Sequence, residues 1–117
     1  MVPLPVADEL ADEVRRLADH LRRLPESRLR RRHDELAGET TADAARALAQ
    51  WLADVEGGLT PSDDRPARLP VLSDLAVGDM VAVTGQDLVG AVRRHPEVDA
   101  GLVSEAVSRL RRLRRVA

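Results

Sequence analysis

Arginines are the residues best suited to chemistry in this sequence, and they gather in two dense runs. One run surrounds Leu29, and the other surrounds Leu110 and Leu113 near the end of the sequence. Guanidinium groups recognise phosphates and carboxylates, so such runs are typical of surfaces that bind nucleic acid or an acidic partner. The candidate surface consists of Arg28, Arg30, Arg31, Arg32, Arg109, Arg111, Arg112, Arg114 and Arg115.

Both runs also have a purely structural interpretation. Cations stabilise the C-terminal end of a helix, and arginine stems cover apolar surface while the guanidinium stays in water. A helix-turn-helix that reads DNA with residues 41–56 is excluded, because this segment has one arginine, Arg46, against three acidic residues. The alternatives that remain are a solvated helix face, a nucleic-acid surface and a site for another partner.

Histidines and carboxylates form no recognisable metal site. A metal site in a helix bundle needs two ligands three or four residues apart on one helix, with further ligands facing them. His20, His33 and His95 fall on three different predicted segments. We expect ordinary core or boundary histidines, and a site built on His20 and His33 would require their rings to meet in space. No metal or cofactor is therefore predicted.

Nucleophilic and phosphate-binding motifs are missing as well. The sequence has no cysteine, which excludes disulfides and thiolate chemistry. Its serines have no histidine nearby and no nucleophile elbow, and the glycines after Val77 fit neither a dinucleotide-binding loop nor a phosphate loop. Trp51, the single tryptophan, has the spacing of a core or dimer contact. We predict that the protein is not an enzyme.

The composition predicts one small domain over residues 1–117. The chain has 117 residues and a net charge of −2, and 44% of its residues are hydrophobic, which fits a single packed core. Isoleucine, lysine, asparagine, phenylalanine and tyrosine are absent, a bias that indicates a high-GC bacterium. A core of leucine, valine and alanine is light, so we expect modest stability and a homodimer.

Apolar spacing places most of the chain in amphipathic helices. Residues 7–24 carry apolar side chains at alternating spacings of four and three, which predicts one buried helical stripe. This stripe consists of Leu10, Val14, Leu17, Leu21 and Leu24. Ion pairs four residues apart should support the same helix: Asp12 with Arg16 and Asp19 with Arg23.

Glycines and threonines mark the next boundaries. A short helix is predicted over residues 26–37 and should end at Gly38. A longer helix should begin at a cap formed by Thr40 or Thr41 and end near Glu56, before a pair of glycines. Residues 57–70 contain three prolines and predict an exposed loop.

Residues 72–94 allow two interpretations. Apolar residues recur at helical spacing, which favours a helix that begins at Ser73 or Asp74. The minor alternative is a short strand near 79–84 in an α+β fold, although no partner strand is visible. A last helix is predicted from Asp99 to the end of the sequence. The predicted fold class is therefore all-α, a small bundle of four to five helices.

Charge is distributed unevenly along the chain. Residues 1–33 have eight arginines against six acids, residues 34–92 have three against eleven, and residues 93–117 have seven against three. Such segments neutralise one another when they pack side by side. Alternatively, the basic segments leave a patch for nucleic acid or an acidic partner.

Taken together, these features predict a non-enzymatic interaction or regulatory protein. We expect it to be cytoplasmic and to have no membrane partner, because residues 1–5 are not the start of a secretory signal. No run reaches the roughly 18 apolar residues of a membrane span. The leading partner is a protein, including a second copy of the chain. The alternative is nucleic acid bound by the arginine runs.

Overall fold

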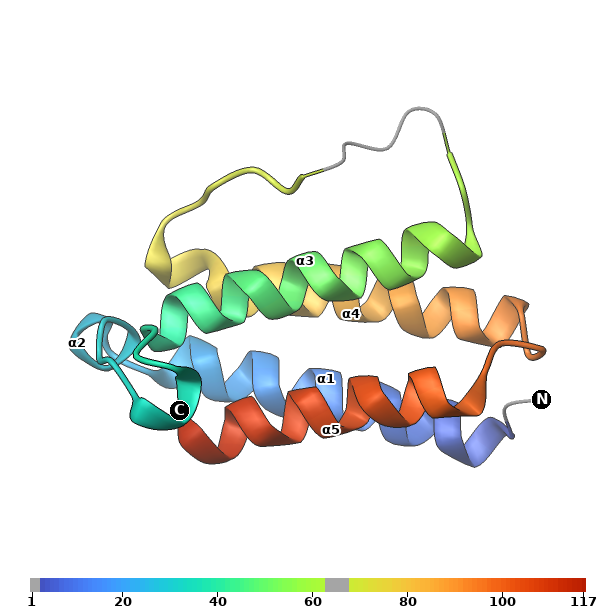
Figure 1. Ribbon diagram of the computed structural model, residues 1–117, viewed down its shortest axis with the longest axis horizontal. Helices are drawn as coiled ribbons and strands as arrows, with labels where there is room; N and C mark the ends of the chain where they lie inside the picture. The colour runs from blue at the N-terminus through green and yellow to red at the C-terminus, as the bar shows by residue number, and fades with distance from the viewer. Residues whose placement is uncertain (1–2, 63–67) are drawn as a thin grey trace.

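The computed structural model describes residues 3–62 and 68–117, and this part of the chain forms an all-α bundle (Figure 1). Its long helices are α1 (Leu4–Arg23), α3 (Thr41–Leu59), α4 (Val77–Arg94) and α5 (Ala100–Val116). Shorter turns connect them: α2 (Glu26–Leu29) and the 3-10 turns η1 (Asp34–Leu36) and η2 (Asp74–Ala76). The predicted fold class is confirmed, and the described residues form no strand at 79–84 or elsewhere.

Helix α4 is central to the packing. It lies against both α1 and α3, whereas α5 lies against α1 and meets α3 only loosely. Helices α3 and α4 run in the same direction (Figure 1), so the chain between them must return to the end where α3 began. Arg46 anchors the end of this connecting segment, because its Nη2 donates to the Asp74 carboxylate at 2.5 Å and to the Leu72 carbonyl at 2.8 Å.

The predicted helix near the start is confirmed as α1. The first four leucine and valine positions of its stripe are buried, and Leu24 is half-buried just after the helix. The ion pairs differ from those expected. Asp12 pairs with Arg15 at 2.8 Å and Asp19 with Arg22 at 3.4 Å, since a spacing of three brings two side chains as close as a spacing of four.

The predicted helix over residues 26–37 is wrong. After one turn of α2, the chain folds back and forms an isolated bridge between Arg32 and Thr40. The turn places Ala37 and Gly38 at φ angles of 55° and 80°, a left-handed conformation that interrupts a right-handed helix. Leu29 is the one fully buried side chain in this segment, so too little apolar surface is available to stabilise a longer helix.

Helix α3 begins as predicted and ends later than predicted. The Thr40 hydroxyl accepts a hydrogen bond from the Asp43 amide at 3.0 Å and so caps the helix. The helix then continues through Gly57 and Gly58 to Leu59. Leu59 packs against the core, and this contact outweighs the weak helix propensity of the glycines. The loop therefore starts at Thr60; residues 63–67 of the predicted loop lie outside the described residues.

Helix α4 is continuous, and two of its three glycines, Gly78 and Gly85, mark where α1 approaches closely. A Cβ atom added to Gly85 would lie 2.5 Å from Cγ1 of Val14, and one added to Gly78 would lie 3.0 Å from the Ala18 carbonyl. Residues 74–94 are long and apolar enough to cross a membrane by length and composition, yet half of that segment is buried inside the bundle. The central helix of a bundle has the same composition, because both of its sides meet other helices.

Candidate interaction surfaces

The two arginine runs lie at the same end of the bundle. Helix α5 ends beside α1, where the Ala117 carbonyl oxygen is 3.1 Å from Nε2 of His20. It also lies beside the turn that follows α2, because Nη2 of Arg112 donates to the Glu35 carbonyl at 2.6 Å. Figure 1 shows α2 and the C-terminus together at this end. A single surface formed by both runs is therefore geometrically possible.

Several arginines in these runs have partners within the bundle. Arg111 pairs with Glu9 at 2.6 Å, and Arg109 pairs with Glu105 at 2.8 Å. Arg30 pairs with Glu26 at 2.6 Å. These side chains remain partly exposed, but their charge is balanced by a neighbouring carboxylate. They contribute less to a basic surface than the sequence predicts.

Glu13 lies at the centre of a strongly buried charge cluster. Its side chain is only 2% exposed, and it accepts hydrogen bonds or ion pairs from Arg16 at 3.1 Å, Arg111 at 3.2 Å and Arg114 at 3.3 Å. The hydrogen bond that the Arg111 guanidinium donates to the Glu13 carboxylate raises the pKa of Arg111 above its usual value. This cluster holds α5 against α1 and stabilises the fold.

Sequence reasoning missed the role of Glu13, although a signal was present. Glu13 lies three residues after Leu10 and four residues before Leu17, so it shares the apolar face of α1. A carboxylate in that position must be paired when the face is buried. Two of its three arginine partners come from α5, which begins 87 positions later in the chain at Ala100.

The remaining arginines give the end a moderate basic character. Asp34, Glu35 and Glu39 are also exposed here, so the charge is mixed rather than uniformly positive. Six arginines at this end have no carboxylate partner among the described residues: Arg23, Arg28, Arg31, Arg32, Arg112 and Arg115.

The histidines have separate local partners. Nε2 of His33 is 3.0 Å from the buried Thr41 hydroxyl, and His20 meets the end of α5. His95 lies 3.4 Å from the Glu97 carboxylate. Within residues 3–62 and 68–117, no group of three or more histidine or acidic side chains could hold a metal ion.

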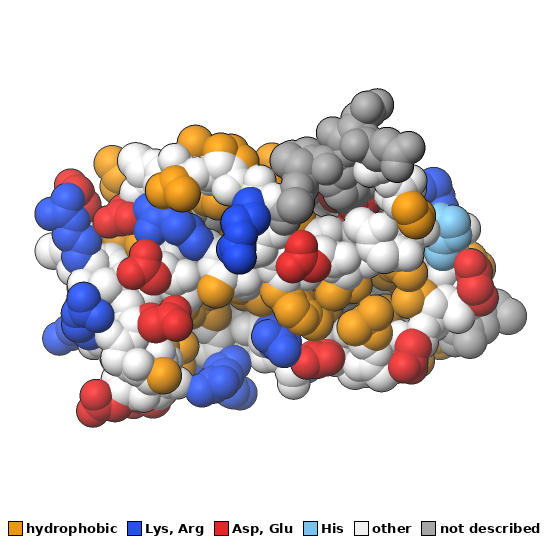
Figure 2. All heavy atoms as spheres, turned by 45° about the horizontal axis from the view of Figure 1, so that its top comes forward, with side chains coloured by type: hydrophobic (Ala, Val, Ile, Leu, Met, Phe, Trp, Pro, Cys, Tyr) orange, Lys and Arg blue, Asp and Glu red, His pale blue; other side chains and the backbone are white. Residues whose placement is uncertain are grey.

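Trp51 lies at the loose seam between α3 and α5. Its ring is half-buried against the core, and the Arg109 guanidinium lies 4.3 Å from the ring centroid. This is a cation–π contact. Figure 2 shows hydrophobic side chains along the middle of this face, bordered by charged side chains on both sides.

A second set of exposed apolar side chains lies where the connection after α3 meets α4. We define the outer apolar patch as Val71, Leu72, Leu75 and Val83, whose exposed fractions are 89%, 43%, 63% and 62%. Leu72 and Val83 line a shallow cavity of about 230 Å³ between residues 69–72 and α4. Sequence reasoning missed this patch because it depends on how the connection after α3 lies against α4.

Comparison with known proteins gives no relative from which a role could be transferred. No protein-family model, curated protein or solved structure matches the chain.

Proposed function

We propose that the protein is a non-enzymatic interaction module that forms a homodimer through the outer apolar patch. The observation that carries this proposal is the exposure of four large apolar side chains, of which Leu72 and Val83 line the same shallow cavity. Exposed apolar side chains that cluster mark a site of association. The light core supports the same conclusion, since a small Leu/Val/Ala bundle gains stability from further apolar burial.

The charges beside the patch suit a second copy of the same surface. Asp79 lies between Leu75 and Val83 in the sequence, and it pairs with Arg22 of the same chain at 2.7 Å. Asp74 is neutralised by Arg46. A two-fold interface brings the same patch from both copies together. With these acids already paired, two patches can meet without repulsion between like charges.

Light scattering on the purified chain and on a patch variant tests the proposal. The wild type should have a mass near twice 12.8 kDa, and Leu75→Glu/Val83→Glu should be a monomer with unchanged helical circular dichroism. The matched control, Ala100→Glu/Ser104→Glu, places two glutamates at exposed positions of α5 and should remain a dimer. A wild-type monomer across a dilution series would contradict the proposal.

A second candidate function is nucleic-acid binding. The observation that favours it is the position of both arginine runs at one end of the bundle, with six arginines that have no carboxylate partner there. Binding of a fluorescent duplex should then fall steeply between about 50 mM and about 200 mM salt, because counterion release dominates such affinity.

Variants separate this candidate from non-specific attraction. Arg28→Gln/Arg31→Gln/Arg115→Gln should abolish duplex binding, while Arg15→Gln/Arg93→Gln/Arg94→Gln removes the same charge elsewhere and should bind like the wild type. Absence of binding at the lower salt concentration would eliminate nucleic acid as a partner. Equal losses of duplex affinity in both triple variants would indicate non-specific electrostatic attraction of the duplex that does not depend on this surface.

A further inference from the structure

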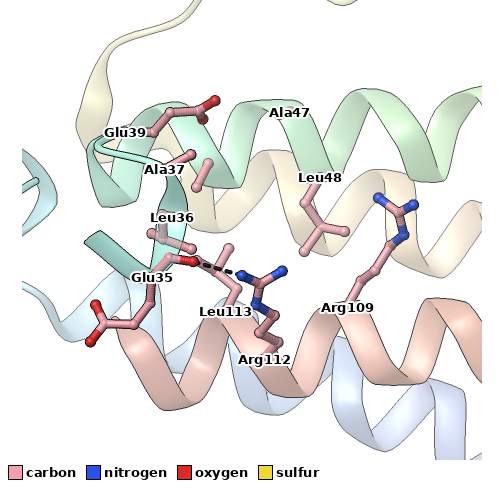
Figure 3. Close-up of a pocket in the computed structure, with 10 residues that line it drawn as sticks. Glu35, Leu36, Ala37, Glu39, Ala47, Leu48, Arg109, Arg112 and Leu113 are labelled. Atoms are coloured by element: carbon pink, nitrogen blue, oxygen red, sulfur yellow. Dashed lines mark hydrogen bonds between the residues drawn. The ribbon is translucent and has the colours of Figure 1, made fainter. Parts of the chain in front are cut away.

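The loose seam between α3 and α5 contains a groove that the bundle leaves unfilled. Its walls are the first half of α3, the last half of α5 and the turn at residues 35–39, and its volume is about 340 Å³ (Figure 3). Small-molecule sites start at about this size. The groove is separate from the outer apolar patch, with which it shares no lining residue.

The groove has an apolar floor. Leu48 and Leu113 are buried beneath it, Leu36 and Ala44 are half-buried at its edge, and Ala47 is exposed on its α3 wall. A floor of this kind favours a hydrocarbon group over water.

The charges that face the groove are positive. The Arg112 guanidinium lies over the floor and is oriented by its hydrogen bond to the Glu35 carbonyl. Figure 3 also shows that the Glu35 and Glu39 carboxylates point away from the centre of the groove. No carboxylate among the described residues pairs with Arg112. Its remaining N–H groups are available to an anion.

Arg109 lies at the same wall, with its charge balanced by Glu105 of the same helix. Its guanidinium extends from α5 toward α3 (Figure 3), and two contacts restrict it: the ion pair with Glu105 at 2.8 Å and the stacking on Trp51 at 4.3 Å. A side chain that is already ordered loses less conformational entropy when a ligand binds.

We propose that the groove binds a small amphiphile with one anionic head group, a carboxylate or a phosphate. The head group pairs with Arg112 and approaches Arg109, since guanidinium groups form paired hydrogen bonds with both anions. The apolar part lies on Leu48 and Leu113. The positive wall disfavours cationic amphiphiles, and the small volume favours a short apolar group.

Trp51 makes this proposal directly testable, because it is the single tryptophan and lies beside Arg109. Decanoate and decyl phosphate, each kept below its micellar concentration, are titrated into the full chain while Trp51 fluorescence is recorded. Calorimetry gives the stoichiometry. We expect saturable binding with one molecule per chain for at least one of the two anions, and their relative affinities identify the preferred head group. Decyltrimethylammonium should not bind.

Three variants connect the signal to the groove. Arg112→Gln should weaken binding about tenfold or more, because it removes the charged hydrogen-bond donor. Ala47→Phe, at an exposed position on the groove wall, should block the floor. Arg115→Gln is the control: it removes an exposed arginine of the same helix that does not line the groove, and it should bind like the wild type.

Three results would overturn the proposal. One is the absence of saturable binding by both anions. The others are equal binding of the anionic and cationic amphiphiles and equal affinities of the Arg112→Gln and Arg115→Gln variants, each of which would indicate non-specific apolar adsorption. The Leu75→Glu/Val83→Glu variant should retain amphiphile binding, so the outcome does not depend on dimer formation.

Discussion

Helix α5 forms two seams with very different character. Toward α1, the buried carboxylate of Glu13 engages Arg111 and Arg114, and the two helices pack closely. Toward α3, the main polar contact is the stacking of Arg109 on Trp51, and a groove remains open. Arginines three residues apart lie on one helical face, so pairing of Arg111 and Arg114 with Glu13 turns Arg109 and Arg112 toward α3. There Arg109 pairs with Glu105 of its own helix, and Arg112 donates to the Glu35 carbonyl.

The crossing of α1 and α4 is closer still at Gly85, and its ion pairs, Arg22 with Asp79 and Arg93 with Asp8, lie at the exposed edges of the contact. Gly85 lies directly against Val14, with no space for a Cβ atom. Three ways of joining helices therefore coexist in one small bundle: glycine-mediated contact, a buried ion cluster and an open apolar groove. The first two hold the fold together, and the third leaves surface that a ligand can use.

The largest effect is expected where α1 and α4 cross. Gly85→Leu should destabilise the protein by about 3 kcal/mol, because the new side chain overlaps Val14 in a packed core. Urea unfolding at one fixed protein concentration measures the change. Gly58→Ala is the control: nothing lies within 4 Å of an added Cβ there, and the gain in helix propensity should raise stability by up to about 1 kcal/mol. An unchanged midpoint for Gly85→Leu would contradict the close crossing.

An intermediate effect is expected at the α1–α5 seam. Glu13→Gln removes the negative charge while it keeps the shape, and stability should fall by about 2 kcal/mol, because hydrogen bonds to a charged group are lost and arginines lose their counter-charge. Glu9→Gln is the matched control, since the Glu9 side chain is 45% exposed and should contribute less than about 1 kcal/mol. Equal losses in the two variants would show that burial of Glu13 does not strengthen its pairing.

The smallest effect is expected at the α3–α5 seam. Arg109→Gln should reduce stability by only about 0.5 kcal/mol, because a cation–π contact at an exposed site is weak. Trp51 fluorescence should nevertheless change, since the guanidinium leaves the ring. A stability loss as large as that of Glu13→Gln would mean that this seam is as tightly joined as its counterpart.

Local physics accounts for the helices that were predicted correctly. The apolar period of α1 and the Thr40 cap of α3 lie within a few neighbouring residues, and an apolar period selects a helix without reference to the rest of the chain. In the same way, Asp99 caps α5 by accepting from the Gly101 amide at 2.8 Å. For these elements, sequence spacing contains the necessary information.

The errors share one cause, which is contact between residues farther apart than one helical turn. The bridge between Arg32 and Thr40 replaces the end of a predicted helix, and core packing of Leu59 extends α3 past two glycines. In both places, local preferences differ by about 1 kcal/mol or less per residue, so a few tertiary contacts reverse them.

For the candidate surfaces as well, the sequence predicted one part and the tertiary structure decided the other. Composition and spacing established that the chain is a small helical protein with two arginine runs. Whether a given arginine faces a carboxylate or an open groove depends on how α5 rotates against α1 and α3, as Arg111 and Arg112 illustrate. Neighbouring residues on a helix point about 100° apart, so one rotation of the helix sets the partner of every side chain on it.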